Sequence, residues 1–204
     1  MENQPASIDI MRLSGLADAW RQLLQSECPD DWCRLLPDIN IDSPDRLLEP
    51  GTLPVLKFLP RLASGAPSTY RPFIDRLIDA QDGLYFGQTY SAEDFGQDFL
   101  DQYGWIKLLG PDAYWNSDSL SSGFLILGDS NTYPRHRHQA EEIYLPISGN
   151  ALWYREHDGW REKPAGTLIH HPGGIEHAMR TRGDPLIALY LWRGGNLTQK
   201  SEIC

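Results

Sequence analysis

The first half of the chain carries apolar residues at helical spacing. Near the N-terminus they recur at steps of three and four, which places them on one stripe of a helix. These residues are Leu13, Leu16, Trp20, Leu23 and Leu24. Frequent prolines between Pro29 and Pro72 limit the next helices to short ones, which we expect at 43–51 and 53–64. A further helix is expected over 69–81. Its buried stripe should consist of Phe73, Leu77 and Ile78.

After Gly104 the pattern changes to short apolar or alternating runs separated by glycine, proline and aspartate. Such runs are typical of consecutive strands in a sandwich or barrel. They occupy 104–110, 122–128, 142–149, 151–157, 166–173 and 185–194. The dipeptide Asp158-Gly159 fits a two-residue hairpin turn, because both positions tolerate positive φ. We therefore expect a mainly β fold, with a helical cover over 1–103 and a β-barrel over 104–204.

The composition excludes several classes of protein. Of the 204 residues, 41% are hydrophobic and 23% are charged, which is typical of a folded globular chain. A formal net charge of −10 disfavours binding to nucleic acid and to anionic membranes. The N-terminus has no basic region followed by an apolar run, and no stretch approaches the roughly 20 apolar residues that span a bilayer. We expect a cytoplasmic protein with reduced thiols at Cys28, Cys33 and Cys204.

A polar face is predicted within the segment 133–149. Side chains alternate across a strand with period two. If the segment stays extended, a polar set projects from one face and an aliphatic set from the other. The polar set is His136, His138, Glu142 and Tyr144, and the aliphatic set is Ile143, Leu145 and Ile147. The polar set would line an interior cavity, and its two imidazoles and carboxylate supply three of the ligands that a first-row divalent ion takes.

His177 is the predicted fourth ligand. Pro172 and the two glycines after it form a tight turn into a new strand, and His177 follows where that strand would enter the barrel beside the first one. A lone histidine on a strand is more often a surface or core residue than a ligand, so the combination carries the hypothesis. His170 and His171 lack the offset of His177 from the proline, and we expect them to have a supporting or surface role.

The same residues resemble the two motifs of the cupin family. The first motif has HxH, then a glutamate after three residues and a glycine after six more. It is matched by Gly128, His136, His138, Glu142 and Gly149, with the leading glycine two residues further away than usual. The second motif is matched by Gly166, Pro172, Gly174 and His177, with Thr181 where many cupins have asparagine. This resemblance implies a cupin barrel of jelly-roll-like architecture.

A finer resemblance is to the dimethylsulfoniopropionate lyases of cupin type. The similar segments cover about half of the chain, at 103–110, 125–153, 170–181 and 186–194. The resemblance implies cleavage of the substrate to dimethyl sulfide and acrylate. It implies one divalent metal held by His136, His138, Glu142 and His177, with Tyr144 as the base and Tyr133 and Trp192 lining the substrate pocket. Iron(II), manganese, cobalt, nickel and zinc all suit such a ligand set.

The proposed reaction fits these residue types. A metal that binds the substrate carboxylate stabilises the charge that develops when the α-carbon loses its proton. Tyr144 is on the ligand face and could take that proton, or it could be a cavity tyrosine that only donates a hydrogen bond. Tyr133 is the next candidate for the base. Aromatic faces attract the sulfonium cation, and Trp192 shares strand parity with Tyr190.

Two alternatives use the same barrel. Another metal-dependent cupin enzyme, a dioxygenase or an isomerase, would keep the four ligands and act on a different substrate, and oxygen consumption would distinguish a dioxygenase. A non-enzymatic cupin would bind a small molecule with a structural metal or none. The expected partner is a small sulfonium carboxylate, and a homodimer stays open as an assembly state. We expect the helical cover to close the mouth of the barrel.

Overall fold

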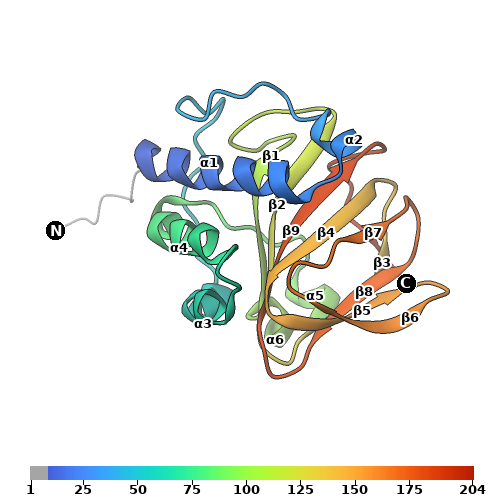
Figure 1. Cartoon of the computed structure of the whole chain (residues 1–204). Coiled ribbons are helices and arrows are strands. Elements are labelled where there is room, and N and C mark those ends of the chain that lie inside the picture. The colour runs from blue at the N-terminus through green and yellow to red at the C-terminus, as the bar shows by residue number, and fades with distance from the viewer. Residues whose placement is uncertain (1–8) are drawn as a thin grey trace.

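The computed structural model describes residues 9–204, in which two five-stranded antiparallel sheets face each other and helices pack beside them (Figure 1). One sheet has the strand order β1-β2-β9-β4-β7 and the other β10-β3-β8-β5-β6. The strands are β1 (Tyr103–Leu109), β2 (Leu120–Leu127), β3 (Thr132–Arg137), β4 (Glu141–Ser148), β5 (Asn150–Arg155), β6 (Gly159–Pro164), β7 (Ile169–His171), β8 (His177–Thr181), β9 (Leu186–Arg193) and β10 (Glu202–Ile203). The mainly β fold class predicted from the sequence, a cupin barrel with an N-terminal helical region, is confirmed.

The helices precede the strands in the described part of the chain. The α-helices are α1 (Ile10–Glu27), α2 (Asp30–Cys33), α3 (Leu59–Gly65), α4 (Arg71–Ala80), α5 (Ala92–Phe95) and α6 (Gln97–Leu100), and the 3₁₀ helices are η1 (Pro54–Phe58) and η2 (Gln81–Gly83). Within residues 9–204, no helix is both long and apolar enough to cross a membrane. The predicted apolar stripe of the first helix is confirmed, because all of its members are buried in α1. Asp9 caps that helix by accepting a hydrogen bond from the backbone N–H of Met11 (3.0 Å).

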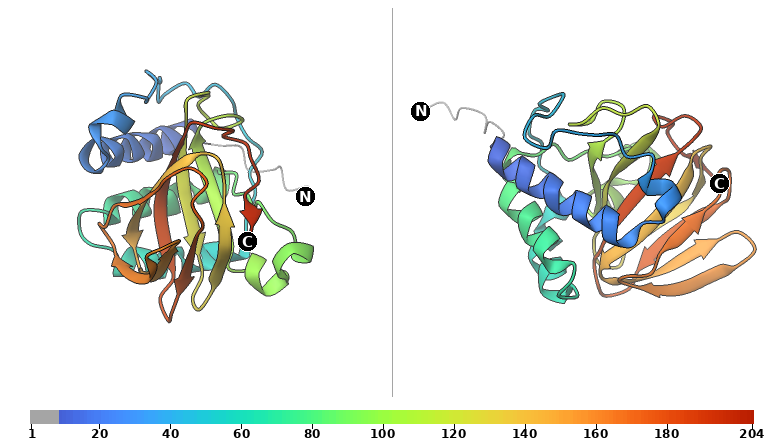
Figure 2. Two further views of the ribbon diagram at one scale, coloured as in Figure 1. Left: turned by 90° about the vertical axis from the view of Figure 1, so that its right-hand side faces the viewer. Right: turned by 45° about the horizontal axis from the view of Figure 1, so that its top comes forward.

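Helices α1 to α4 cover the outer face of the first sheet, as two further views show (Figure 2). Phe73 of α4 stacks on Phe124 of β2, with ring centroids 4.1 Å apart. The predicted stripe of α4 needs one correction: Ile74 is fully buried, whereas Ile78 is only partly buried. Because this hydrophobic cluster takes side chains from both the helices and the sheet, the division at 103/104 stays a prediction.

A second hydrophobic cluster fills the space between the two sheets. On β4 the side chains alternate as predicted, with the aliphatic set packed against the helices and Tyr144 in the cluster between the sheets. The aliphatic set is Ile143, Leu145 and Ile147. The strand parity that predicted an inward-facing polar set is therefore confirmed for β4.

The segment 133–149 is not one extended strand, as the parity argument had assumed. β3 ends at Arg137, β4 begins at Glu141, and the two strands belong to different sheets. The chain crosses between the sheets at 138–140, where the His138 carbonyl accepts a hydrogen bond from the Gly174 N–H (2.7 Å). The polar side chains meet because the two sheets face each other across the barrel.

Two local predictions are wrong. Residues 43–51 form no helix, because their polar groups bind the loop before β2 instead; Arg46 N–H donates to the Tyr114 carbonyl at 3.2 Å. The hairpin between β5 and β6 pairs Arg155 with Gly159, so its loop is three residues long. The left-handed positions are His157 (φ 72°) and Gly159 (φ 70°), and Asp158 lies between them.

Candidate metal centre and active site

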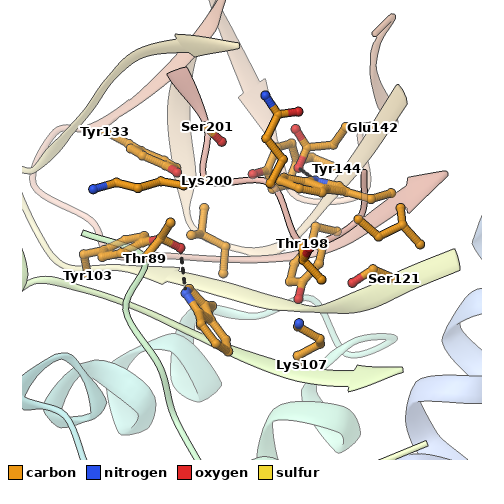
Figure 3. A pocket seen from close by; sticks show the side chains of 16 residues that line it. Thr89, Tyr103, Lys107, Ser121, Tyr133, Glu142, Tyr144, Thr198, Lys200 and Ser201 are labelled. Carbon is orange, nitrogen blue, oxygen red and sulfur yellow. Dashed lines mark hydrogen bonds between the residues drawn. The ribbon is translucent and has the colours of Figure 1, made fainter. Parts of the chain in front are cut away.

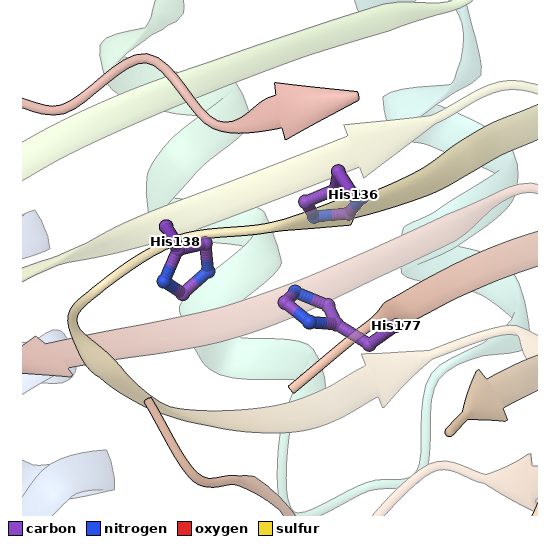
Figure 4. A group of neighbouring side chains, drawn as sticks. All are labelled: His136, His138 and His177. Carbon is purple, nitrogen blue, oxygen red and sulfur yellow. The ribbon is translucent and has the colours of Figure 1, made fainter. Parts of the chain in front are cut away.

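Three buried histidines converge between the two sheets (Figure 4). His136 lies on β3 and His177 lies directly opposite it at the start of β8, as the sequence predicted for adjacent strands. His138 follows β3 by one residue. One ring nitrogen from each histidine can be chosen so that all of these atoms lie within 4.8 Å of one another. This spacing is small enough for one metal ion to bind all three.

The backbone fixes which nitrogen of each ring carries the hydrogen. In all three histidines the Nδ1 atom lies within hydrogen-bonding distance of a backbone carbonyl, which can only accept. The pairs are His136 with Pro134 (2.8 Å), His138 with Ala140 (2.9 Å) and His177 with Ile175 (3.0 Å). Nδ1 therefore donates, and in the neutral imidazole Nε2 is the atom that is available to bind a metal.

Glu142 of β4 reaches the cluster from the other sheet and is fully buried. Its Oε2 lies 3.0 Å from Nε2 of His138 and 3.1 Å from Nε2 of His177. Burial raises the pKa of Glu142, but the neighbouring imidazoles, His138 first and then His177, outweigh that effect and hold the pKa well below its usual range. The carboxylate is thus anionic beside the histidines.

The donor set fits a metal ion. The buried Nε2 of His177 makes no hydrogen bond to any residue in 9–204, which is costly unless another group binds it. Burial, followed by the charge of His177, lowers the pKa of His136 well below its usual range and favours its neutral, metal-binding form. Imidazole nitrogens together with a carboxylate oxygen suit first-row divalent ions.

A cavity of about 230 Å³ adjoins the cluster (Figure 3). Glu142 lies in its wall, and β1, β2, β4 and β9 contribute most of the remaining side chains. Its aromatic lining consists of Tyr103, Trp105, Tyr133, Tyr144, Tyr190 and Trp192. The ammonium groups of Lys107 and Lys200 also belong to side chains that line it. The cavity can therefore bind a small organic molecule next to the histidines.

The three predicted pocket residues all line this cavity. Burial, followed by the charge of Glu142, raises the pKa of Tyr144 well above its usual range. Tyr133 stacks on His136 with ring centroids 4.2 Å apart, and its hydroxyl lies 3.0 Å from that of Tyr90. Trp192 stacks on His138 at 4.0 Å and donates its indole N–H to Oε1 of Glu142 at 2.5 Å. The structure thus brings all seven residues predicted from the sequence to one place.

The sequence left a supporting or a surface role open for His170 and His171, and the structure separates the two. Whereas His170 is half-exposed and binds Glu141, His171 is buried and stacks on His177 with ring centroids 4.3 Å apart. It pairs with Glu142 across β7 and β4. Neither of its ring nitrogens finds a hydrogen-bond partner among the described residues, and burial, followed by the charge of His177, lowers its pKa to about 3. The alternation of β7 could have placed His171 inside, had its pairing with β4 been known.

The C-terminal segment is a feature that the sequence did not predict. Residues 197–201 line the cavity, and β10 then pairs with β3 so that Ile203 lies opposite His136. An ion pair between Arg137 and Glu202 (2.7 Å) and one between Lys200 and Asp94 (2.9 Å) hold this segment in place. No apolar periodicity or motif marks these residues in the sequence.

Comparison with known proteins agrees with this geometry. A family model described as dimethylsulfoniopropionate lyase matches residues 32–188, well over half of the chain. Dimethylsulfoniopropionate lyase DddQ of Ruegeria pomeroyi is 35% identical over 127 residues, which are 62% of this chain and 63% of that protein. Putative dimethylsulfoniopropionate lyase DddL of Cereibacter sphaeroides is 32% identical over 108 residues, 52% of this chain and 44% of that protein. The matched segment thus spans less than two thirds of each of these relatives.

Solved structures of similar proteins extend the match to nearly the whole chain. The crystal structure of DMSP lyase DddQ from Ruegeria pomeroyi superimposes with a TM-score of 0.84 at 28% identity, covering 95% of this chain and 96% of that one. A chain from the crystal structures of the DMSP lyases RdDddP and RnDddQII has the same TM-score and identity and is 98% covered. The resemblance stated from the sequence motifs is confirmed, and the chain belongs to the dimethylsulfoniopropionate lyase family.

Proposed function

We propose that this protein cleaves dimethylsulfoniopropionate to dimethyl sulfide and acrylate by β-elimination, with one bound divalent metal. The observation that carries the proposal is the buried triad of histidines. Their Nδ1 atoms are committed to backbone carbonyls, and they adjoin an aromatic cavity in a chain of the dimethylsulfoniopropionate lyase family. The relative DddQ is named a dimethylsulfoniopropionate lyase and DddL a putative one, which supports the proposed substrate.

The metal would be held by His136, His138, Glu142 and His177. The short distances from Oε2 of Glu142 to two of the imidazoles support the inclusion of the carboxylate. When bound, a divalent ion supplies positive charge that stabilises both the charge developing on the substrate carboxylate and the phenolate of a nearby tyrosine. Iron(II), zinc, manganese, nickel and cobalt are all compatible with these ligands, and the affinity order does not choose among them.

Tyr144 is the proposed base. As the phenolate, with its own proton already lost to solvent, Tyr144 would take the proton from the α-carbon of the substrate, and the electron pair of that C–H bond would become the new C=C bond. The C–S bond then breaks, and its electrons leave with neutral dimethyl sulfide. Tyr144 lines the cavity two residues after Glu142 on the same face of β4, which supports this role. Tyr133 is the alternative, and its hydroxyl lies next to that of Tyr90.

The aromatic lining is the proposed site for the sulfonium group. Ring faces attract a weakly hydrated cation, and Tyr133 and Trp192 both present rings to the cavity. Lys107 and Lys200 also line the cavity, but Lys107 donates to the Pro111 carbonyl and Lys200 is paired with Asp94, so the rings are the groups best suited to the cation. The substrate would thus lie with its carboxylate toward the histidines and its sulfonium toward an aromatic wall.

The test is headspace detection of dimethyl sulfide above purified protein given dimethylsulfoniopropionate. We expect sulfide and acrylate in equal amounts, loss of both after treatment with a chelator, and recovery when a divalent metal is restored. Oxygen consumption is measured in parallel, and we expect none that depends on the enzyme. Absence of dimethyl sulfide from metal-loaded protein would reject the proposed substrate, and turnover that survives complete metal removal would reject the metal.

A further inference from the structure

We propose that Trp192 orients Glu142 for metal binding. The indole N–H binds one carboxylate oxygen, and the other oxygen stays available for the ion. This inference rests on the metal site proposed above and assigns Trp192 a positioning role in addition to its place in the cavity wall. The number of Glu142 oxygens that can bind the metal would determine how many positions around the ion stay open for a substrate carboxylate.

The two oxygens of Glu142 have different neighbours. Glu142 and Trp192 are directly opposite each other on the paired strands β4 and β9. Trp192 Nε1 donates to Oε1 at 2.5 Å, whereas Oε2 lies 3.0 Å from His138 Nε2 and 3.1 Å from His177 Nε2. The strand register therefore turns one oxygen toward the histidines and the other toward the indole.

The hydrogen bond is well suited to fixing this arrangement. An indole N–H donates only, so it cannot bind a metal and cannot exchange roles with the carboxylate. A donor to an anionic carboxylate makes a stronger bond than a donor to a neutral acceptor. Glu142 has no exposed surface, and Trp192 is partly buried beside it in the cavity wall. While this bond persists, Oε1 points toward the indole and Oε2 points toward the histidines.

Trp192 also supports a second proposed ligand. Each histidine of the triad carries a stacked ring, and the planes lie within 30° of parallel. The pairs are Tyr133 on His136 (4.2 Å, 20°), Trp192 on His138 (4.0 Å, 29°) and His171 on His177 (4.3 Å, 15°). A stacked ring and a bound Nδ1 together restrict rotation of an imidazole. Trp192 differs from the other two stacked rings because it also donates a hydrogen bond to Glu142.

This arrangement has a consequence for substrate binding. A carboxylate ligand can bind an ion through one oxygen or through both. If Glu142 used both, it would occupy one more position and compete with the substrate carboxylate. By holding Oε1, Trp192 would favour binding of a metal through Oε2 alone and would leave that position free for the substrate. Trp192 is therefore a positioning residue for the metal ligands.

Cobalt(II) is the probe, because its visible absorption spectrum changes with the number and geometry of its ligands. Trp192→Phe keeps a ring over His138 and removes the N–H. We expect this variant to bind Co²⁺ about 10- to 100-fold more weakly than wild type, the usual cost of losing a group that orients a ligand. We also expect its absorption spectrum to indicate a higher coordination number of the bound Co²⁺. Added acrylate should change that spectrum less than it changes the spectrum of wild type.

Two further proteins make the result specific. Trp153→Phe is the matched control, because Trp153 is a buried residue of the same interior whose N–H has no partner in residues 9–204. We expect Co²⁺ affinity and spectrum close to those of wild type. In the second protein, Trp192 is replaced by the tryptophan analogue that has sulfur in place of the indole N–H. The bicyclic shape is kept and the donor is lost, so we expect this protein to behave like Trp192→Phe.

The possible results separate the two proposals. A wild-type protein that binds no stoichiometric Co²⁺ would reject the metal site of the proposed function. Stoichiometric binding in wild type, with unchanged affinity and spectrum in Trp192→Phe and in the sulfur analogue, would overturn the inference about Trp192 alone. Equal changes in Trp192→Phe and Trp153→Phe would also overturn it, because general repacking would then explain the effect.

Discussion

The two faces of the sheet β1-β2-β9-β4-β7 both contain fully buried side chains but differ in what they hold. The outer face packs aliphatic side chains such as Leu145 and Leu189 against α1, α3 and α4. The inner face holds Glu142, Tyr144 and Trp192. Leu189 and Glu142 both have no exposed surface, although one is apolar and the other is a charged carboxylate. Burial alone therefore does not distinguish a stabilising face from a functional one.

The two faces do differ in whether their buried polar atoms form hydrogen bonds. On the outer side Trp20 donates to Ser122 Oγ (3.0 Å) and Ser148 donates to the Leu62 carbonyl (2.7 Å). In the barrel interior, by contrast, side-chain nitrogens of Trp153, His171 and His177 lack hydrogen-bond partners within residues 9–204. An unsatisfied buried polar atom costs about 1–3 kcal/mol. Such unsatisfied atoms in the barrel interior are consistent with the proposed binding of a metal and a substrate there.

The largest effect is expected from His177→Ala, on the inner face. Removal of a proposed ligand should weaken metal binding by more than about 100-fold, beyond the usual loss for groups that only orient a ligand, and abolish most activity. Circular dichroism should show an intact barrel. The control is His157→Ala, whose side chain is 83% exposed in the loop between β5 and β6. Elemental analysis decides the result: full metal occupancy in His177→Ala would remove His177 from the proposed ligands.

Leu189→Ala tests the outer face of the same sheet. This change opens a cavity beneath the helices, and we expect the free energy of unfolding to fall by about 2–5 kcal/mol. Because Leu189 points away from the histidines, the folded variant should bind metal with unchanged stoichiometry. Denaturant unfolding and elemental analysis measure the two quantities separately. A loss of metal at temperatures where the variant is folded would contradict the separation of the two faces.

The sequence predicted those parts of the molecule that depend on local spacing. The helical stripe of α1, the strand runs and the inward parity of Tyr144 all follow from periodicity, which each segment carries by itself. His136 and His177 were expected on adjacent strands because a tight turn leads into β8, and they lie directly opposite each other. Local patterns were sufficient for most of the candidate site.

The parts that failed depend on contacts between distant segments. The crossing between sheets at 138–140 depends on barrel closure and on the bond from Gly174 to the His138 carbonyl. The burial of His171 depends on the pairing of β7 with β4, and the role of residues 197–201 depends on the docking of β10 on β3. For residues 43–51, bonds to the loop before β2 overrode a helical pattern. None of these partners is visible in a single short segment.

Tyr144→Phe separates the catalytic role of an inner-face residue from its packing role. The variant keeps the ring and loses the oxygen, so we expect metal content to be retained and kcat to fall by at least ~10²-fold, the low end for a general base. Tyr154→Phe is the control, because Tyr154 lies on the next position of β5 after the interior Trp153 and stacks with Arg135 instead. Near-normal turnover in Tyr144→Phe would transfer the role to Tyr133, which the corresponding Tyr133→Phe variant tests.

The smallest expected effect concerns the aromatic wall and uses Trp192→Ala. If the ring attracts the sulfonium, its loss should cost about 0.5–2 kcal/mol of binding, which is roughly 2- to 30-fold in affinity.

The variant also loses the hydrogen bond to Glu142 and the stack on His138, so a single affinity would not isolate the contribution of the cation–π contact. The ratio of two affinities does: one for dimethylsulfoniopropionate and one for the neutral thioether with the same chain and carboxylate. Disturbance of the metal ligands affects both molecules alike, because both present the same carboxylate, whereas loss of the cation–π contact affects only the charged one. Wild type should prefer the charged ligand and Trp192→Ala should not. Equal weakening of both ligands would limit Trp192 to its role beside Glu142 and His138 and place the sulfonium against the other rings of the cavity.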